Sequence, residues 1–380
     1  MRSVIQKVIF IILLSSSIAL AISAAAQTFT TLVNFTGSNG GNPQDALVQG
    51  SDGNFYGTTY YGGLIGSGTF FVMTPQGNLT TLYQFAVHDD LFGPSGTLVQ
   101  GHDGNFYGVS GGGNYNAGAI YKITPSGAST PLYSFCSQQN CPDGRAPEAG
   151  LILANDGNFY GTTLSGGASN NCSLGCGTIF KITPSGAFTL LHTFAGSDGS
   201  YTAAPLVQGR DGYLYGTSWV GGAYNWGTVF KMSLSGTFTM LHSFDISDGA
   251  WPESGVVEGS DGNFYGTTAM GGNTGCETGA TCGTIFKITP SGTLTTLHFF
   301  SGPDGWAPLA GLVLASDGNF YGTTNSLRER DKINQALSLY LKEHKVPKQL
   351  RPDEKQYLED LGRSLRLVDS QLAALDKDVD

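Results

Sequence analysis

The sequence predicts an all-β repeat protein: a six-bladed β-propeller with an incomplete last blade, followed by a C-terminal α-helical hairpin or coiled-coil segment. Each repeat switches four times between short β-like runs and turn residues. The composition is rich in small and aromatic residues, with 56 glycines, 22 phenylalanines and 17 tyrosines. The phrase Asp-Gly-Asn-Phe-Tyr-Gly-Thr-Thr, or a variant of it, recurs 50 to 56 residues apart, beginning at Asp52, Asp103, Asp156, Asp211, Asp261 and Asp317.

Residues 1–26 have the pattern of a secretory signal peptide. Arg2 and Lys7 precede an apolar run over 8–22, and three alanines end at Ala26. This pattern predicts cleavage before Gln27. No later segment reaches 18 consecutive apolar residues, so we expect no transmembrane segment after cleavage. The mature protein is therefore expected to be secreted, periplasmic or on the cell surface.

Residues 27–324 are predicted to form the propeller from repeats of about 53 residues. In the fifth repeat the β-like runs cover 255–258, 264–268, 283–289 and 293–300, and turn residues such as Pro290-Ser291-Gly292 separate them. Four strands in a meander, repeated with glycine and aromatic punctuation, are typical of a propeller blade. Residues 28–35 match a fourth strand, and they are expected to complete the last repeat, which stops at Thr324 after its second strand.

Residues 325–380 are predicted to be a charged helical tail. They hold 22 of the 48 charged residues of the chain. Residues 327–344 read as a helix capped by Ser326. After Pro352 a second helix is expected, because apolar residues alternate at spacings of three and four, and this predicts self-association through 352–376. The apolar positions are Leu358, Leu361, Leu365, Val368, Leu372 and Leu375.

The repeats carry a family resemblance. Asp-Gly-Asn-Phe-Tyr-Gly-Thr-Thr over 261–268, followed by Gly-Thr-Ile-Phe-Lys-Ile-Thr-Pro-Ser-Gly over 283–292, resembles the GloVer tandem repeats of exported bacterial proteins. The resemblance covers residues 28–324 and implies a propeller, export and no established activity, so it supplies no catalytic residue. More loosely, the core phrase is similar to sensor propellers of two-component regulators. The tail is not recognised, which favours a gene fusion.

The charge balance and the motifs exclude several functions. Between Gln27 and Thr324 there are 6 Lys and Arg against 18 Asp and Glu, a formal charge of −12 that disfavours nucleic acid and anionic lipid. The Asp-Gly-Asn phrase lacks the alternating ligands of a calcium loop and reads as a hairpin turn. The Gly-x-Ser-x-Gly match over 108–112 falls in a strand and predicts no catalytic serine.

Metal and cofactor sites are not expected either. His192, His242 and His298 occupy one repeat position on three different blades, so they cannot converge on a metal. The six cysteines form three local pairs, and no histidine lies beside any of them. In an exported protein such pairs favour disulfides, although six cysteines formally allow fifteen pairings. The expected disulfides are Cys136–Cys141, Cys172–Cys176 and Cys276–Cys282.

One loop face is the candidate binding surface. In a propeller meander, the loops that join second to third strands and those that join successive blades emerge on the same face. These loops hold every cysteine pair, all four tryptophans and a recurring Asp-Gly-x-x-Pro pattern. Aspartates beside aromatic residues suit a carbohydrate, whereas the alternative is that they only shape turns and packing. The candidate ligand-binding residues are Asp143, Arg145, Asp198, Tyr201, Trp219, Trp226, Asp248, Trp251, Asp304 and Trp306.

Three functions remain open from the sequence. The first is an exported non-catalytic repeat protein that binds a polysaccharide or another cell-surface protein through this loop face. The second is a carbohydrate-active enzyme, a glycoside hydrolase or lyase, which would need two carboxylates drawn from Asp198, Asp248, Glu253 and Asp304. Recurrence of the aspartates in several copies disfavours it, and Glu253 partly escapes that objection. The third is a purely structural scaffold.

Overall fold

The structure is a computed structural model that describes residues 30–86, 91–272 and 282–325. These residues form strands, turns and loops and contain no helix, so no membrane-spanning helix is found among them. The predicted signal peptide over 1–26 lies outside the described residues. The predicted helical tail does too, apart from Asn325.

The strands group into repeated antiparallel sheets, five of four strands and a last one of two. The first sheet is β1 (Val48–Gln49), β2 (Phe55–Thr59), β3 (Thr69–Met73) and β4 (Leu79–Gln84). The second is β5 (Pro94–Gln100), β6 (Phe106–Ser110), β7 (Ala119–Ile123) and β8 (Ser129–Ser134). The third is β9 (Ile152–Leu153), β10 (Phe159–Thr163), β11 (Thr178–Ile182) and β12 (Phe188–Thr193).

The remaining sheets repeat the same plan. The fourth is β13 (Val207–Gln208), β14 (Leu214–Ser218), β15 (Thr228–Met232) and β16 (Phe238–Ser243). The fifth is β17 (Val257–Glu258), β18 (Phe264–Thr268), β19 (Thr284–Ile288) and β20 (Leu294–Phe299). The last sheet has only β21 (Val313–Leu314) and β22 (Phe320–Tyr321). The four runs predicted in the fifth repeat are thus confirmed to within two residues at each end.

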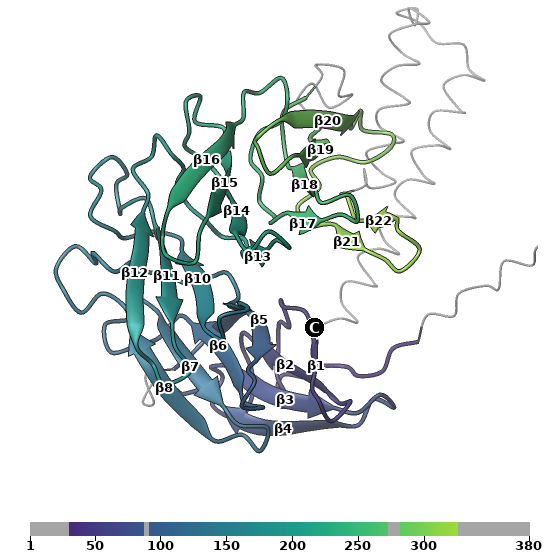
Figure 1. Cartoon of the computed structure of the whole chain (residues 1–380). Helices are drawn as coiled ribbons and strands as arrows, with labels where there is room; N and C mark the ends of the chain where they lie inside the picture. The colour runs from purple at the N-terminus through teal and green to yellow at the C-terminus, as the bar shows by residue number, and fades with distance from the viewer. Residues whose placement is uncertain (1–29, 87–90, 273–281, 326–380) are drawn as a thin grey trace, which may run out of the picture.

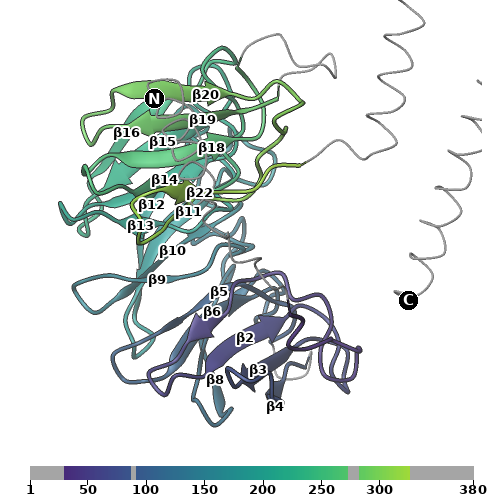
Figure 2. The same ribbon diagram turned by 90° about the vertical axis from the view of Figure 1, so that its right-hand side faces the viewer.

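The sheets follow one another around a common centre. Figure 1 shows the first strands of the sheets toward the inside and the fourth strands, such as β4, β12 and β20, toward the outside. Figure 2 shows the same succession from the side. Within each complete sheet the strands pair in sequence order, and the ladder between the third and fourth strands carries one β-bulge, for example between Ile285 and Phe286. The arrangement is propeller-like, as predicted.

The recurring phrase forms a tight turn followed by a buried strand. Asp103 accepts a hydrogen bond from the Asn105 backbone N–H at 3.2 Å, and the Tyr107 hydroxyl donates to its second carboxylate oxygen at 2.9 Å. Gly104 between them has a φ of 78°, a value that glycine adopts without strain. The interpretation of the phrase as a hairpin turn is confirmed.

Aromatic rings join each sheet to the next. The tyrosine of a second strand stacks on the first residue of the next sheet's second strand, which is a phenylalanine except at Leu214. We call this the sheet-to-sheet ring contact. Stacked and tilted rings of this kind add stability beyond the area that they bury. The centroid distances are 4.3 Å for Tyr56–Phe106, 4.0 Å for Tyr107–Phe159, 3.7 Å for Tyr215–Phe264 and 4.2 Å for Tyr265–Phe320.

The N-terminal segment takes the place of a fourth strand without pairing as one. Phe35 packs on Phe71 with ring centroids 5.3 Å apart, the same contact that Phe135 at the end of the second sheet makes with Phe180 at 5.3 Å. Residues 30–35 nevertheless form no strand, and the last sheet contains only β21 and β22. The expectation that this segment completes the last repeat is therefore not met among the described residues, because no third strand lies between them to pair with.

Candidate functional site

The two classes of loop predicted to share a face do come together. Backbone bridges pair four of the five loops between successive sheets with the residues that follow the next second strand, as in Arg145 with Ser165 and Ala250 with Met270. The backbone N–H of Trp251 donates to the carbonyl of Trp226 at 2.9 Å, which joins the two kinds of loop directly. The two kinds of loop therefore lie side by side in the described chain.

The predicted aspartates turn toward their own sheets. In three of them one carboxylate oxygen contacts a histidine Nε2 of the preceding fourth strand, and in the other it accepts a hydrogen bond from a tyrosine hydroxyl. Each aspartate also accepts a hydrogen bond from a backbone N–H of its own loop. These contacts fasten the loop and support the turn-shaping alternative; binding of a ligand by these carboxylates stays a prediction. The pairs are Tyr133–Asp143 at 2.7 Å, His192–Asp198 at 3.0 Å, His242–Asp248 at 2.8 Å and His298–Asp304 at 2.7 Å.

Three of the four tryptophans gather at the fourth and fifth repeats. Trp251 lies between the other two, with ring centroids 6.0 Å from Trp219 and 6.1 Å from Trp226. The Trp219 backbone N–H donates to the carbonyl of Tyr201 at 3.2 Å, so this predicted residue borders the group. We call Trp219, Trp226 and Trp251 the tryptophan cluster. Trp306 lies apart from it, paired through its backbone with Asn325.

A cavity of about 510 Å³ opens on the loop face between the first three repeats. Its wall combines residues of the loops that precede β1, β5 and β9 with residues that follow β2 and β6; two residues of β5 and Ala203, from the loop before β13, complete it. Arg145 is the one predicted ligand-binding residue that lines it. The other large polar side chains in its wall are Gln44, Asp45, Tyr60, Tyr61, Asn116 and Glu148.

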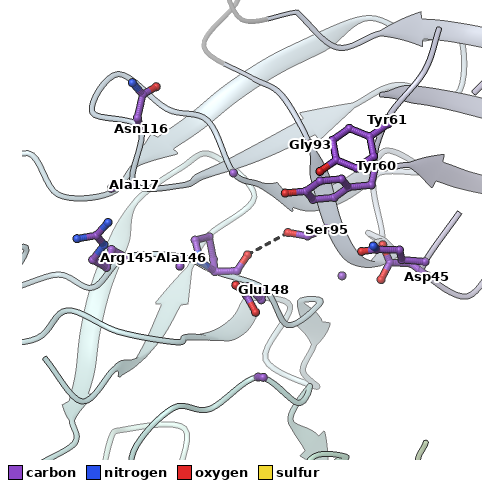
Figure 3. A pocket seen from close by; sticks show the side chains of 15 residues that line it. Asp45, Tyr60, Tyr61, Gly93, Ser95, Asn116, Ala117, Arg145, Ala146 and Glu148 are labelled. Atoms are coloured by element: carbon purple, nitrogen blue, oxygen red, sulfur yellow. Dashed lines mark hydrogen bonds between the residues drawn. The ribbon is translucent and has the colours of Figure 1, made fainter. Parts of the chain in front are cut away.

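Figure 3 shows how these groups face one another. Tyr60, Tyr61 and Asp45 lie on one side of the cavity. Arg145 and Asn116 lie on the other side, and Glu148 lies between the two groups. The two tyrosine rings are nearly perpendicular, with centroids 4.5 Å apart, and Tyr61 is 56% exposed. An aromatic pair with one exposed and one half-buried ring thus borders a polar hollow.

The charged side chains of the cavity make few hydrogen bonds or ion pairs within the described chain. Burial raises the pKa of Asp45, and a hydrogen bond from the backbone of Gly96 offsets this only in part. Burial also raises the pKa of Glu148. Among the described residues the side chains of Arg145 and Glu148 form no hydrogen bond or ion pair. These groups are therefore available to bind a ligand.

Five residues of the cavity wall were not predicted from the sequence: Asp45, Tyr60, Tyr61, Asn116 and Glu148. One signal was present for the tyrosines, because Tyr60 directly follows a second strand at the repeat position that Trp219 occupies. Another was present for the glutamate: Glu148 follows the proline of the Asp-Gly-x-x-Pro pattern. Glu253 has the same place in its own repeat, and burial raises its pKa too.

The cysteines and histidines take structural roles in the described part of the chain. Disulfides join Cys136 to Cys141 and Cys172 to Cys176, as predicted. Cys282 is also disulfide-bonded, while Cys276, its predicted partner, lies outside the described residues. No group of three or more metal-ligating side chains is found within 30–86, 91–272 and 282–325.

Comparison with known proteins places the fold and the family. The chain is similar to the solved structure of virginiamycin B lyase from Staphylococcus aureus, with 17% identity and a TM-score of 0.51 over 79% of this chain and 89% of that one. It is also similar to a streptogramin B lyase, with 16% identity and a TM-score of 0.50 over 79% of this chain and 87% of the other. No curated protein matches the chain in sequence.

At such identities these likenesses support the propeller-like fold alone. The family is shown independently by sequence. The profile of the Gloeobacter/Verrucomicrobia repeat matches residues 18–174 and 171–332, which together cover most of the chain and agree with the resemblance seen in the repeats. The chain therefore belongs to the Gloeobacter/Verrucomicrobia repeat family.

Proposed function

We propose that this chain is an exported, non-catalytic protein that binds a neutral glycan in the cavity between its first three repeats. The scaffold is a six-bladed propeller with an incomplete last blade. The disulfides fit an extracellular or periplasmic protein, because such bonds persist in oxidising compartments. The proposal rests above all on the composition of the cavity wall.

The proposal rests on a tyrosine pair that borders the side chains of Arg145, Asn116 and Glu148, which have no hydrogen-bond partner among the described residues. Tyr60 and Tyr61 offer ring faces on which the C–H faces of a sugar can pack. Arg145 and Asn116 can donate hydrogen bonds to sugar hydroxyls, and the carboxylate of Glu148 can accept them. A cavity of about 510 Å³ lies within the range typical of small-ligand sites.

Charge favours a neutral ligand over an acidic one. The repeats carry a formal charge of −12, and Asp45 and Glu148 add local negative charge to the cavity. An acidic polysaccharide would meet repulsion at this wall, with Arg145 as the one cation that lines it. A neutral glycan satisfies the hydrogen-bonding groups without that cost.

The tryptophan cluster offers a second contact region on the same loop face. Trp219 is 39% exposed and stands at the edge of Trp251. A long polysaccharide that leaves the cavity can cross this cluster, and a cell-surface protein is the other partner suited to such a face. The cavity and the cluster are separable by mutation.

A panel of neutral and acidic polysaccharides tests the proposal. The protein is mixed with each glycan. The fraction of protein retained on the glycan and the release of reducing ends are both measured. We expect retention on a neutral glycan without release, lost in the double variant Tyr60→Ala, Tyr61→Ala and kept in Tyr213→Ala, whose side chain is 39% exposed in the turn between β13 and β14. Retention on no glycan would leave the protein-binding or purely structural alternatives.

A carbohydrate-active enzyme is the second candidate, and one observation favours it. Asp45 and Glu148 lie in the same cavity, and burial raises the pKa of both, a property that suits a general acid. The carboxylates considered from the sequence suit catalysis less well, because histidines contact Asp198, Asp248 and Asp304. The similar lyases contribute only their fold to this question.

Glu148→Gln separates binding from catalysis. The amide keeps the size and the hydrogen-bonding capacity of the side chain but cannot transfer a proton as a carboxyl group does. If the chain is an enzyme, this variant should retain glycan binding and lose at least a hundredfold in reducing-end release. Under the binding proposal neither protein releases reducing ends, and release by the wild type would contradict it.

A further inference from the structure

At each end of the series of sheets, one residue of the sheet-to-sheet ring contact has no partner among the described residues. Tyr56 and Tyr215 are 4% and 0% exposed because the next sheet covers them, whereas Tyr321 of the last sheet is 56% exposed. Phe55 of the first sheet has the position that receives such a tyrosine. It has no tyrosine from a preceding sheet among the described residues.

A second repeated contact ends in the same way. At three interfaces between sheets, the residue before the turn aspartate donates its backbone N–H to a side-chain oxygen. That oxygen belongs to a residue in the first strand of the next sheet. The last sheet offers the N–H of Ser316, and the first sheet offers the side-chain oxygen of Gln49, at the matching positions; neither has a hydrogen-bond partner in the described chain. The filled examples are Ser51–Gln100 at 3.0 Å, Asn155–Gln208 at 2.8 Å and Arg210–Glu258 at 3.0 Å.

Apolar side chains surround these unused groups. Val313 and Leu309 of the last repeat are 65% and 48% exposed, and Leu47 beside the first sheet is 45% exposed. At an interior interface the matching Leu206 is 4% exposed. The two end surfaces are thus the two halves of one interface that recurs inside the array. The surface at one end complements the surface at the other end, and neither complements a second copy of itself.

The two ends do not meet within the described chain. Figure 1 and Figure 2 both show the first sheet and the last sheet apart, and no hydrogen bond or ring contact joins them among the described residues. A partner that carries both missing halves in the right geometry is a second copy of the same chain. Surfaces that match each other in this way give a head-to-tail contact.

We propose that a second copy of this chain docks head-to-tail, with its first sheet against the last sheet of the first copy. Tyr321 then stacks on the partner's Phe55, and the N–H of Ser316 donates to the partner's Gln49. The contact repeats the interior sheet-to-sheet interface and covers the exposed apolar side chains of both ends. It goes beyond glycan binding and does not depend on it.

A head-to-tail contact predicts assemblies whose mass grows with concentration, since an open assembly keeps a free docking surface at each of its two ends until a ring closes. Light scattering after size-exclusion chromatography should show this growth for the wild type. Tyr321→Ala removes the central ring of the contact and should shift the equilibrium at least tenfold toward monomer. Tyr224→Ala, which truncates a side chain that is 61% exposed elsewhere, should leave the mass unchanged.

Crosslinking distinguishes this contact from ring closure within one chain and from association through the tail. Two single variants, Ser316→Cys and Gln49→Cys, are mixed and treated with a short bis-maleimide, and each is also treated alone. We expect crosslinked dimers in the mixture and not in either variant alone. A double variant that carries both cysteines is treated in the same way. Crosslinks that form only within one chain of this double variant, or none in any sample, would overturn the proposal.

Discussion

Asp198 shows how a side chain that recurs in the repeats can be consumed by the fold. One carboxylate oxygen contacts the imidazole of His192 at 3.0 Å, and the other accepts the Ala195 backbone N–H at 2.7 Å. His192 in turn stacks on Phe238 of the next sheet, with ring centroids 4.0 Å apart. The aspartate therefore ties a loop, a strand and the neighbouring sheet together, which accounts for its recurrence without a ligand.

Truncation of this aspartate should destabilise the protein. Asp198→Ala leaves the Ala195 N–H without its acceptor in a partly buried site, which costs about 1–3 kcal/mol. Asp304→Ala removes the same contacts where the histidine and aspartate side chains are 46% and 40% exposed, so water can replace them and the loss should be smaller. Urea unfolding of both variants measures the difference. Equal losses would contradict the account.

Acid should weaken the same contacts. Burial would raise the pKa of Asp198, but the hydrogen bonds from His192 and the Ala195 backbone outweigh it, so the pKa is lowered from 3.8. A lowered folded-state pKa gives stability that is present above pH 3.8 and lost as the pH falls below it through the folded-state value. Asp198→Asn should therefore lose less of its unfolding free energy than the wild type between pH 4 and pH 2, roughly the interval in which such a carboxyl titrates.

At the scale of the elements, the turn and its following strand act as one unit. The tyrosine of each second strand but the last packs against the next sheet, and its hydroxyl donates to the aspartate of its own turn, as in Tyr56 with Asp52 at 3.0 Å. Burial first, and then this hydrogen bond, raises the pKa of Tyr56 from 10.0 to about 12. Burial and the turn aspartate also raise the pKa of Tyr107, Tyr160, Tyr215 and Tyr265.

These tyrosines should make the fold sensitive to alkali. A raised folded-state pKa means that the unfolded chain loses its protons first, so stability is complete below pH 10 and falls as the pH rises toward 12. Tyr56→Phe removes one such group and should lose less of its unfolding free energy across that window than the wild type. Circular dichroism during alkaline titration measures it. An identical pH dependence in the two proteins would be inconsistent with this role.

The strands were predictable because the repeat presents the same pattern many times. The runs expected at 264–268 and 283–289 are found as β18 and β19, since alternation and turn chemistry are local properties of the sequence. The pairing of residues 28–35 was not predictable from that pattern. A strand needs a neighbour to pair with, and the described chain places none between this segment and β22.

At the scale of the whole molecule, the candidate site was only partly visible in the sequence. The placement of Arg145 and the tryptophans on one loop face follows from where the loops emerge, whereas the contacts among three of the tryptophans do not. The cavity does not, because it forms where three repeats converge and joins residues as distant as Asp45 and Glu148. Whether a side chain has a protein partner also depends on tertiary contacts. Asp198 is held by His192, whereas Glu148 has no such partner among the described residues.

The central claim is that a neutral glycan occupies the cavity between the first three repeats. Isothermal titration of a neutral oligosaccharide series into the wild type and Tyr60→Ala tests it most directly. We predict binding by the wild type and a loss of about tenfold in affinity, or ~1.4 kcal/mol, when the ring is removed. An affinity that is unchanged in Tyr60→Ala, or the absence of binding by the wild type across the series, would contradict the account.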